Sequence, residues 1–446
     1  MAAWKEEITR WLEPFLVRLG HKKRRQMCPL YVAGLIGPGE RKSMEPMAAR
    51  LMPDHYDRLH HFISDGVWDA DPLEEELAIQ AERMVGGPEA VLVIDDTALP
   101  KKGDHSVGVA PQYASALGKT ANCQSLVSVT LASREVPVTV GLKLFLPESW
   151  TSAPERMVKA RVPKGRQRAQ TKPEIAIEEI DRLIAAGVRF GMVLADSGYG
   201  SSASFRRALS ERGLRWAVGL SRRQNVYCAD VVLMFPVAKT GRRRKYHIPD
   251  TPPIDAEAML ADENWRKVTW RRGTKGPLSC RFAARRVRIA DGHRHRMADN
   301  RVQCMPGEEV WLVGERRSSG EQKYYVSNLP ANAPLKALAT AIKARWVCEQ
   351  AHQQMKEELG LDHFEGRSWQ GLHRHALMTM IAYAFLQHRR LGQGGREKKN
   401  PDRTASAKHA GRATRSHRRS RAEAIARTLP ALPHPSAMEI TMKLPK

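Results

Sequence analysis

The sequence lacks long apolar segments. None of its apolar runs approaches the roughly 20 residues that a membrane-spanning helix requires. The stretch from Met1 to Gly20 is amphipathic and of mixed charge, which is not the pattern of a secretory signal peptide. We therefore expect a soluble protein of the cytoplasm.

Paired cysteines are also missing. The six cysteines form no Cys-x-x-Cys pair and show no zinc-binding spacing with histidine. This pattern argues against a disulfide-stabilised domain and a zinc finger. With 446 residues, the chain is long enough for two or three domains with cores of their own.

Acidic residues are few relative to basic ones. The chain has 48 Asp and Glu against 73 Lys and Arg, which gives a formal net charge of +25. Such an excess predicts a polyanionic partner, and nucleic acid is the usual one for a basic soluble chain. The alternative is that these side chains only solvate the surface, but many of them occur in short runs such as Lys22–Arg25 and Arg242–Lys245.

Two apolar runs end in carboxylates. Val91–Ile94 leads directly into Asp95 and Asp96, and Met192–Ala195 leads into Asp196. Uninterrupted apolar runs of this length are typical of strands covered on both faces, and ligand sites in such sheets gather at the carboxyl ends of the strands. We expect these aspartates to share a site.

A third carboxylate lies on a predicted helix from Pro334 to Leu361. Arg345, Glu349 and Lys356 fall on the helical stripe that should face the core. Buried charge is costly, so this glutamate should be ion-paired or hold a metal. Two strand carboxylates and one helix carboxylate could hold two Mg²⁺ ions about 3.5–4 Å apart for in-line attack at phosphorus.

The order Asp95, Asp196, Glu349, with Arg345 and Lys356 around the last acid, resembles the DDE transposases of bacterial insertion sequences. Within them, the chain is similar to the insertion-sequence 701 group over the stretches Ile94–Gly103, Gly118–Gln124 and Trp270–Gly276. The likeness spans roughly Phe15 to His388.

Two details of the site remain open. Related transposases have Tyr three residues before the Arg of the helix signature, where this chain has Ile342. The family's frequent Asp-x-Thr pattern favours Asp95 over Asp96 as the metal ligand, and alternation along a strand allows only one of them to face the metal.

The element pattern predicts an α/β fold with a ribonuclease H-like mixed sheet and flanking helices, interrupted by a β-rich insertion and preceded by an all-helical domain. The predicted divisions are a helical, DNA-binding domain at 1–88, the first part of the catalytic core at 89–220, the β-rich insertion at 221–330, the remainder of the core with the Glu349 helix at 331–391, and a basic, mostly disordered tail at 392–446.

The resemblance implies a DNA transposase that cuts at insertion-sequence ends and joins the freed 3′ ends to target DNA. It implies two Mg²⁺ ions, with Mn²⁺ as a substitute, a homodimer on paired ends, and action at the bacterial nucleoid. Asp95, Asp96, Asp196 and Glu349 are the candidate catalytic residues, and Asp95, Asp196 and Glu349 the candidate metal ligands. Candidate DNA contacts are Arg345, Lys356, Lys101, Lys102, Lys119, Trp270, Arg271, Arg272 and Lys275.

Several alternatives stand beside these assignments. Lys356 could pair with Glu349, the loop lysines could be merely solvated, and Trp270 could be a core residue. The whole chain could instead be a non-catalytic DNA-binding regulator, or an endonuclease of the same fold without strand transfer.

Overall fold

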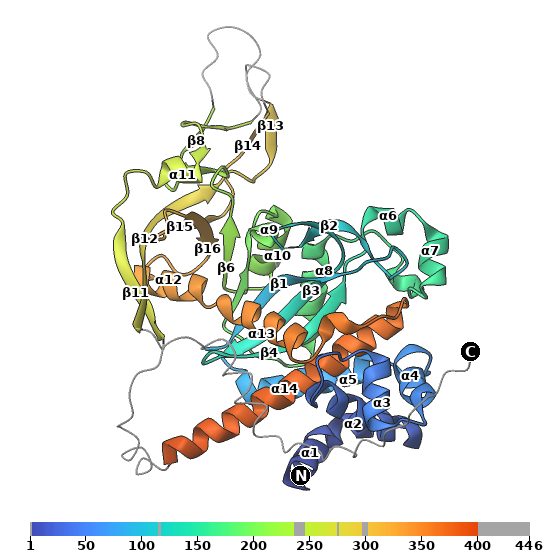
Figure 1. Ribbon diagram of the computed structural model, residues 1–446. Helices are drawn as coiled ribbons and strands as arrows, with labels where there is room; N and C mark the ends of the chain where they lie inside the picture. Colours follow the sequence, from blue (N-terminus) through green and yellow to red (C-terminus); the bar gives the residue numbers. More distant parts are fainter. Residues whose placement is uncertain (1, 115–116, 236–245, 274–275, 297–301, 400–446) are drawn as a thin grey trace, which may run out of the picture.

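The computed structural model describes residues 2–114, 117–235, 246–273, 276–296 and 302–399 (Figure 1). Lys275, the run Arg242–Lys245 and nearly all of the predicted basic tail lie outside these ranges. Among the described helices, none is both long and apolar enough to cross a membrane.

Five helices form the N-terminal part of the chain, as their apolar spacing predicts. Their inner faces carry fully buried side chains such as Leu12, Phe15 and Tyr31. Gly37 caps the second helix, and the third ends just before Pro53, because neither residue type continues a helix well. The helices are α1 (Ala2–Arg18), α2 (Lys22–Ile36), α3 (Met44–Leu51), α4 (Tyr56–Ser64) and α5 (Asp71–Val85).

A large mixed sheet follows. Strand β1 pairs antiparallel with β3 and parallel with β5, and β5 pairs parallel with β6. The β3–β4 turn uses Arg134 and Glu135 with φ of 48° and 65°, the left-handed conformation of a tight hairpin. The strands are β1 (Val91–Pro100), β2 (Ala110–Ala114), β3 (Lys119–Ser133), β4 (Val136–Leu144), β5 (Met192–Ala195) and β6 (Trp216–Leu220).

Helices cover both faces of this sheet, which confirms the mixed α/β class. Helix α8 packs on β3, whereas α5 and α14 pack on β4 (Figure 1). Helix α8 starts with a capping box between Thr171 and Glu174. The helices between β4 and β6 are α6 (Glu148–Thr151), α7 (Pro154–Lys159), a 3₁₀ turn (Lys164–Arg166), α8 (Lys172–Ala185), α9 (Ser197–Gly200) and α10 (Ala203–Glu211).

The segment after β6 is rich in strands and continues the same sheet. Strand β16 pairs antiparallel with β6, so six of the described insertion strands (β7, β10, β11, β12, β15 and β16) extend the core sheet to 12 described strands. The pairs β8–β9 and β13–β14 form separate two-stranded sheets, and the insertion projects away from the N-terminal helices (Figure 1). The elements are β7 (Asn225–Cys228), β8 (Leu233–Met234), β9 (Ile248–Pro249), β10 (Ile254–Asp255), α11 (Ala256–Met259), β11 (Arg266–Gly273), β12 (Gly276–Ile289), β13 (Arg294–Arg296), β14 (Val302–Cys304), β15 (Glu309–Arg316) and β16 (Gln322–Ser327).

The predicted continuous helix from Pro334 to Leu361 is wrong in one respect. It is two helices, α12 (Leu335–Lys343) and α13 (Trp346–Glu357), which meet at Ala344 and Arg345. No Pro or Gly marks the break; it coincides with the point where Arg345 reaches across to β1. A 3₁₀ turn (Leu361–His363) and α14 (Trp369–Lys399) follow. Helix α14 is buried from Leu372 to Phe385 and continues past the predicted boundary at 391 to Lys399, although Gly392, Gly394 and Gly395 are poor helix formers.

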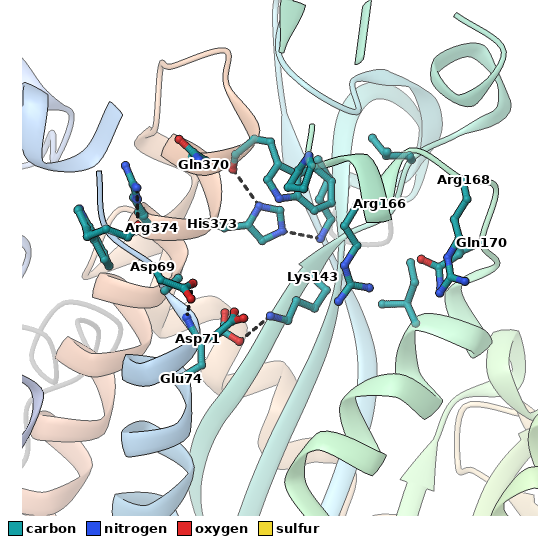
Figure 2. A pocket seen from close by; sticks show the side chains of 17 residues that line it. Asp69, Asp71, Glu74, Lys143, Arg166, Arg168, Gln170, Gln370, His373 and Arg374 are labelled. Carbon is teal, nitrogen blue, oxygen red and sulfur yellow. Dashed lines mark hydrogen bonds and ion pairs between the residues drawn. The ribbon is translucent and has the colours of Figure 1, made fainter. Parts of the chain in front are cut away.

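Buried ion pairs connect the N-terminal helices to the sheet. Lys143 of β4 lies 2.5 Å from Glu74 of α5, at the wall of a cavity of about 300 Å³ between α5, β4 and α14 (Figure 2). Burial lowers the pKa of Lys143, but the Glu179 and Glu74 carboxylates outweigh it and raise that pKa above its ordinary value. None of the predicted site residues lines this cavity.

Candidate active site

Asp95 and Asp96 are neighbours on β1, and their side chains contact different helices. Asp95 Oδ2 accepts a hydrogen bond from Arg345 Nη1 at 2.6 Å and one from the Cys348 thiol at 3.1 Å. Asp96 accepts hydrogen bonds at 2.5 Å from the Tyr199 hydroxyl and from Lys172 Nζ. The alternation of the strand therefore directs Asp95 towards the Glu349 helix and Asp96 towards α8 and α9.

Asp196 follows the end of β5, next to β1. Ile94 and Ala195 are paired across the two parallel strands, so Asp95 and Asp196 each come one residue after a paired position. The Asp196 carboxylate caps α9 by accepting from the amides of Gly198 and Tyr199 at 2.9 and 3.3 Å. Burial raises the pKa of Asp196, and the nearby Asp95 charge raises it further. A carboxylate whose pKa is raised by a neighbouring carboxylate marks a place that a cation would stabilise.

Glu349 lies in the first turn of α13, and its side chain is 63% exposed. Arg345 Nη2 lies 2.8 Å from its Oε1, so one guanidinium bridges Glu349 and Asp95. Burial lowers the pKa of Arg345, but the charges of Asp95, Cys348 and Glu349 outweigh burial and raise it above the ordinary value. The predicted ion pairing of the helix carboxylate is therefore found, and its partner is Arg345.

The two strand aspartates fit a hard divalent cation better than Glu349 does in this arrangement. Their oxygen ligands are of the type that Mg²⁺ prefers, and their mutual repulsion favours a cation. Within the described ranges, no three His, Cys, Asp or Glu side chains are grouped closely enough to hold a metal ion. The structure thus brings Asp95 and Asp196 together and leaves Glu349 on the Arg345 guanidinium.

A cavity of about 800 Å³ opens on the α8 side of the strand ends. Asp96, Asp196 and Tyr199 line it, together with Lys172. Burial raises the pKa of the Tyr199 hydroxyl, and the Asp96 carboxylate raises it further, so Tyr199 remains a hydrogen-bond donor to Asp96. Asp196 therefore borders both this cavity and the neighbourhood of Asp95.

Three side chains around Asp95, those of Ser128, Cys348 and His352, were missed in the sequence. Ser128 of β3 donates to the Asp95 main-chain carbonyl at 3.2 Å, and His352 Nε2 lies 2.7 Å from the Ser128 hydroxyl. Burial lowers the pKa of His352 to about 4, so the imidazole is neutral. Burial, and after it the Asp95 charge, raises the pKa of the Cys348 thiol well above its ordinary value. His352 lies on the predicted stripe of α13, three residues after Glu349, and Cys348 lies three residues after Arg345, which was the available signal; Ser128 had none.

The four predicted lysines that lie within the described residues fall into two pairs. Lys356 donates to the Ala98 carbonyl at 2.8 Å and Lys101 to the Phe364 carbonyl at 2.6 Å, and burial lowers the pKa of both ammonium groups. Lys102 and Lys119 are exposed. The alternative of an ion pair between Lys356 and Glu349 is wrong, because each has a different partner.

The predicted aromatic and basic cluster on β11 is mostly engaged within the protein. Trp270 contacts Phe282 edge to face, and the Lys343 ammonium lies 4.9 Å from its ring centre. Arg271 stacks 4.0 Å over Trp346 and pairs with Glu135 at 3.0 Å. Arg272 is exposed. The packing alternative for Trp270 therefore agrees with its contacts, which join β11 to β12 and α12, while Arg271 joins β11 to α13.

Comparison with known proteins identifies the family. Residues 14–277, more than half of the chain, match the model described as DDE superfamily endonuclease. The chain belongs to the DDE superfamily of endonucleases. The matched range contains Asp95 and Asp196 and ends before Arg345 and Glu349.

A curated relative agrees with this family. The chain is 32% identical over 200 residues to the probable transposase for insertion sequence element IS701 of Microchaete diplosiphon. The match covers 44% of this chain and 48% of that protein, so it spans about half the length of each. It confirms the resemblance to the insertion-sequence 701 group. The piggyBac transposase synaptic complex with hairpin DNA is matched with a TM-score of 0.38 and 9% identity, covering 88% of this chain and 73% of that one.

Proposed function

We propose that this DDE endonuclease is a DNA transposase, which cuts at the ends of an insertion sequence and joins the freed 3′ ends to target DNA. The observation that supports this most is the placement of Asp95 and Asp196 after paired residues of adjacent parallel strands. Membership of the DDE superfamily supplies the chemistry to be expected of such a pair.

In this proposal, β1 to β6 with α8 and α13 form a ribonuclease H-like catalytic core, and residues 221–330 are an insertion into it. The core order β4-β3-β1-β5-β6, with β1, β5 and β6 parallel, supports this division. Residues 1–88 would bind DNA, and residues 392–446 would form a basic tail. The protein would act in the bacterial cytoplasm, at the nucleoid.

Asp95, Asp196 and Glu349 would hold Mg²⁺, with Mn²⁺ as a substitute. The metal ions would activate the attacking hydroxyl and stabilise the charge that develops on phosphorus and on the leaving oxygen. The backbone amides at α9 would keep Asp196 aimed at the strand ends, and Asp96 would hold Tyr199 and Lys172 at the adjoining cavity. Asp96 thus acts beside the metal site.

Exposed basic side chains would hold the DNA backbone near this site. Lys102, Lys119 and Arg272 are exposed on loops and strand ends and are free to approach phosphate. Lys101, Lys356, Trp270 and Arg271 already contact protein groups, so we assign them supporting positions. Two copies would act together, one at each end of the element.

Cleavage of a supercoiled plasmid that carries the native flanking ends tests this function. With Mg²⁺, we expect strand breaks at the element boundary, and the change Glu349→Gln should lower their rate by about 10³-fold or more, since it removes several kcal/mol of charge stabilisation. Mapping both strands and any joined 3′ ends distinguishes transposition from simple hydrolysis. Equal DNA binding without cutting by either protein, in Mg²⁺ and in Mn²⁺, would favour a DNA-binding regulator.

A further inference from the structure

The Arg345 guanidinium lies between two of the three acidic side chains. Nη1 is 2.6 Å from Asp95 Oδ2, and Nη2 is 2.8 Å from Glu349 Oε1. Arg345 itself is the N-cap residue of α13, where the chain changes direction after α12. One planar cation thus links the middle of β1 to the first turn of the glutamate helix.

We propose that Arg345 is an internal counter-cation that keeps Asp95 and Glu349 from binding a divalent metal until DNA phosphate draws the guanidinium away. The proposal rests on the function proposed above. A carboxylate oxygen that accepts a short N–H hydrogen bond from a cation is not available at full strength to Mg²⁺, which needs close contact at about 2.1 Å. Phosphate presents two oxygens to a guanidinium in the same geometry as a carboxylate.

The arrangement makes this exchange feasible. The side chain of Arg345 is 25% exposed and that of Glu349 is 63% exposed, so their contact faces solvent and costs little to break. Asp95 is only 13% exposed, but its carboxylate also accepts from the Asp96 amide at 2.8 Å and from the Cys348 thiol. Departure of Arg345 therefore leaves Asp95 with two hydrogen-bond donors and a mostly buried charge that a divalent cation would compensate.

The departure of Arg345 would affect Asp196 differently from Asp95 and Glu349. The described hydrogen bonds to its carboxylate come from the amides of Gly198 and Tyr199. Arg345 influences it through charge and makes no described hydrogen bond to it. The exchange would thus complete the site by releasing Asp95 and Glu349 towards an Asp196 that is already in place.

Thermodynamic linkage follows from the exchange. If DNA frees the carboxylates, bound DNA must raise the affinity for metal, and bound metal must raise the affinity for DNA by the same factor. The active site would then bind metal only when DNA lies beside it.

Titration of the full-length protein with Mn²⁺ tests the exchange, with bound Mn²⁺ measured by electron paramagnetic resonance. Each protein is measured alone and with a short duplex of random sequence, and Mn²⁺ bound by the duplex alone is subtracted. For the unchanged protein, we expect DNA to tighten Mn²⁺ binding by about tenfold, the value of one strong charged hydrogen bond. In Arg345→Gln, Mn²⁺ should bind about tenfold tighter without DNA, and DNA should add less than about twofold.

Two further variants make the result specific. Arg345→Lys keeps the charge but cannot bridge both carboxylates, so we expect an intermediate Mn²⁺ affinity; it also serves if the glutamine variant does not fold. Arg212→Gln is the matched control, since Arg212 also pairs through two nitrogens with a carboxylate, that of Asp181 at 2.6 and 2.8 Å. It should bind Mn²⁺ as the unchanged protein does.

The possible failures are distinguishable. Equal Mn²⁺ affinity in the unchanged protein and Arg345→Gln, or weaker binding in the variant, would overturn the counter-cation and leave the proposed function standing. No Mn²⁺ binding by any protein, with or without DNA, would overturn both.

Discussion

The strand aspartates and the helix glutamate are held in opposite ways. Asp196 is fixed by two backbone amides at the start of α9, and Asp95 is only 13% exposed on a strand that pairs on both sides. Glu349 is 63% exposed, and its described partner is the single side chain of Arg345. The sheet thus provides two preorganised carboxylates, whereas the helix provides one that can move.

Replacing the two β1 aspartates by asparagine, one at a time, gives the largest expected change in cleavage rate. Asp95→Asn should lower the cleavage rate by about 10³-fold or more, because Asp95 lies on the side of Asp196 and Glu349 and would hold metal. Asp96→Asn should cost about tenfold to a hundredfold, as expected of a residue that orients its neighbours. Initial rates on the plasmid with native ends compare the two.

Each variant is the other's control, since both remove one charge from adjacent positions of the same strand. A larger loss in Asp96→Asn than in Asp95→Asn would move the metal site to the α8 side of β1. Circular dichroism before the assay separates loss of chemistry from loss of fold.

Low pH should destabilise the packing of α13 and α14 on the sheet as well as the candidate active site. Burial lowers the pKa of His352, His373 and His375 from 6.5 to about 4, 3 and 4. The unfolded chain therefore binds more protons than the folded one below pH 6.5, so the stability is complete above that pH and is lost as pH falls towards 4 and 3. The loss amounts to roughly 3 to 5 kcal/mol per histidine at most.

Urea unfolding at about pH 7.5, 6 and 5 measures this slope. His352→Gln should remove the contribution of His352 to the slope of unfolding free energy against pH. The contributions of the two α14 histidines should remain. His105→Gln, at an exposed side chain, should leave the slope unchanged. A free energy of unfolding that stays constant from pH 7.5 to 5 would contradict the burial of these imidazoles as neutral groups.

The sequence predicts the two buried strands better than it predicts the helix. The apolar run before Asp196 identifies the end of β5, whereas β1 continues past Asp95 to Pro100, so the prediction of a strand end at Asp95 is wrong. The stripe predicts the inward side of Arg345, but Glu349, which the same stripe places against the core, is 63% exposed. Spacing also carries no information about a break without Pro or Gly at Ala344 and Arg345.

Partners distant in the chain set the remaining features of the site. Ser128 and Lys172 reach the β1 aspartates or their backbone from β3 and α8, and neither position carries a local pattern that singles it out. Trp270 beside two arginines predicts a DNA contact, but its ring contacts Phe282 and Lys343, which only tertiary structure brings to it. Charge in the sequence thus predicts a partner for the chain more readily than the contacts of one side chain.

The smallest expected effect concerns DNA binding by the adjacent residues Lys101 and Lys102. Lys102 is exposed, whereas Lys101 donates to the Phe364 carbonyl at 2.6 Å. If Lys102 contacts phosphate, Lys102→Ala should weaken duplex binding severalfold and reduce the magnitude of the salt slope by about 0.9, the value of one phosphate contact. Fluorescence anisotropy at several salt concentrations measures both quantities.

Lys101→Ala should have the converse effect, because it leaves a carbonyl near the start of α14 without its donor. We expect a loss of about 1–3 kcal/mol in the free energy of unfolding, measured in urea, and a nearly unchanged salt slope. An unchanged slope in Lys102→Ala together with a reduced one in Lys101→Ala would mean that DNA binding pulls the half-buried ammonium out of its carbonyl contacts. In that case Lys101 would be a structural residue only in the free protein. It would resemble Arg345 as a cation that changes partners when DNA binds.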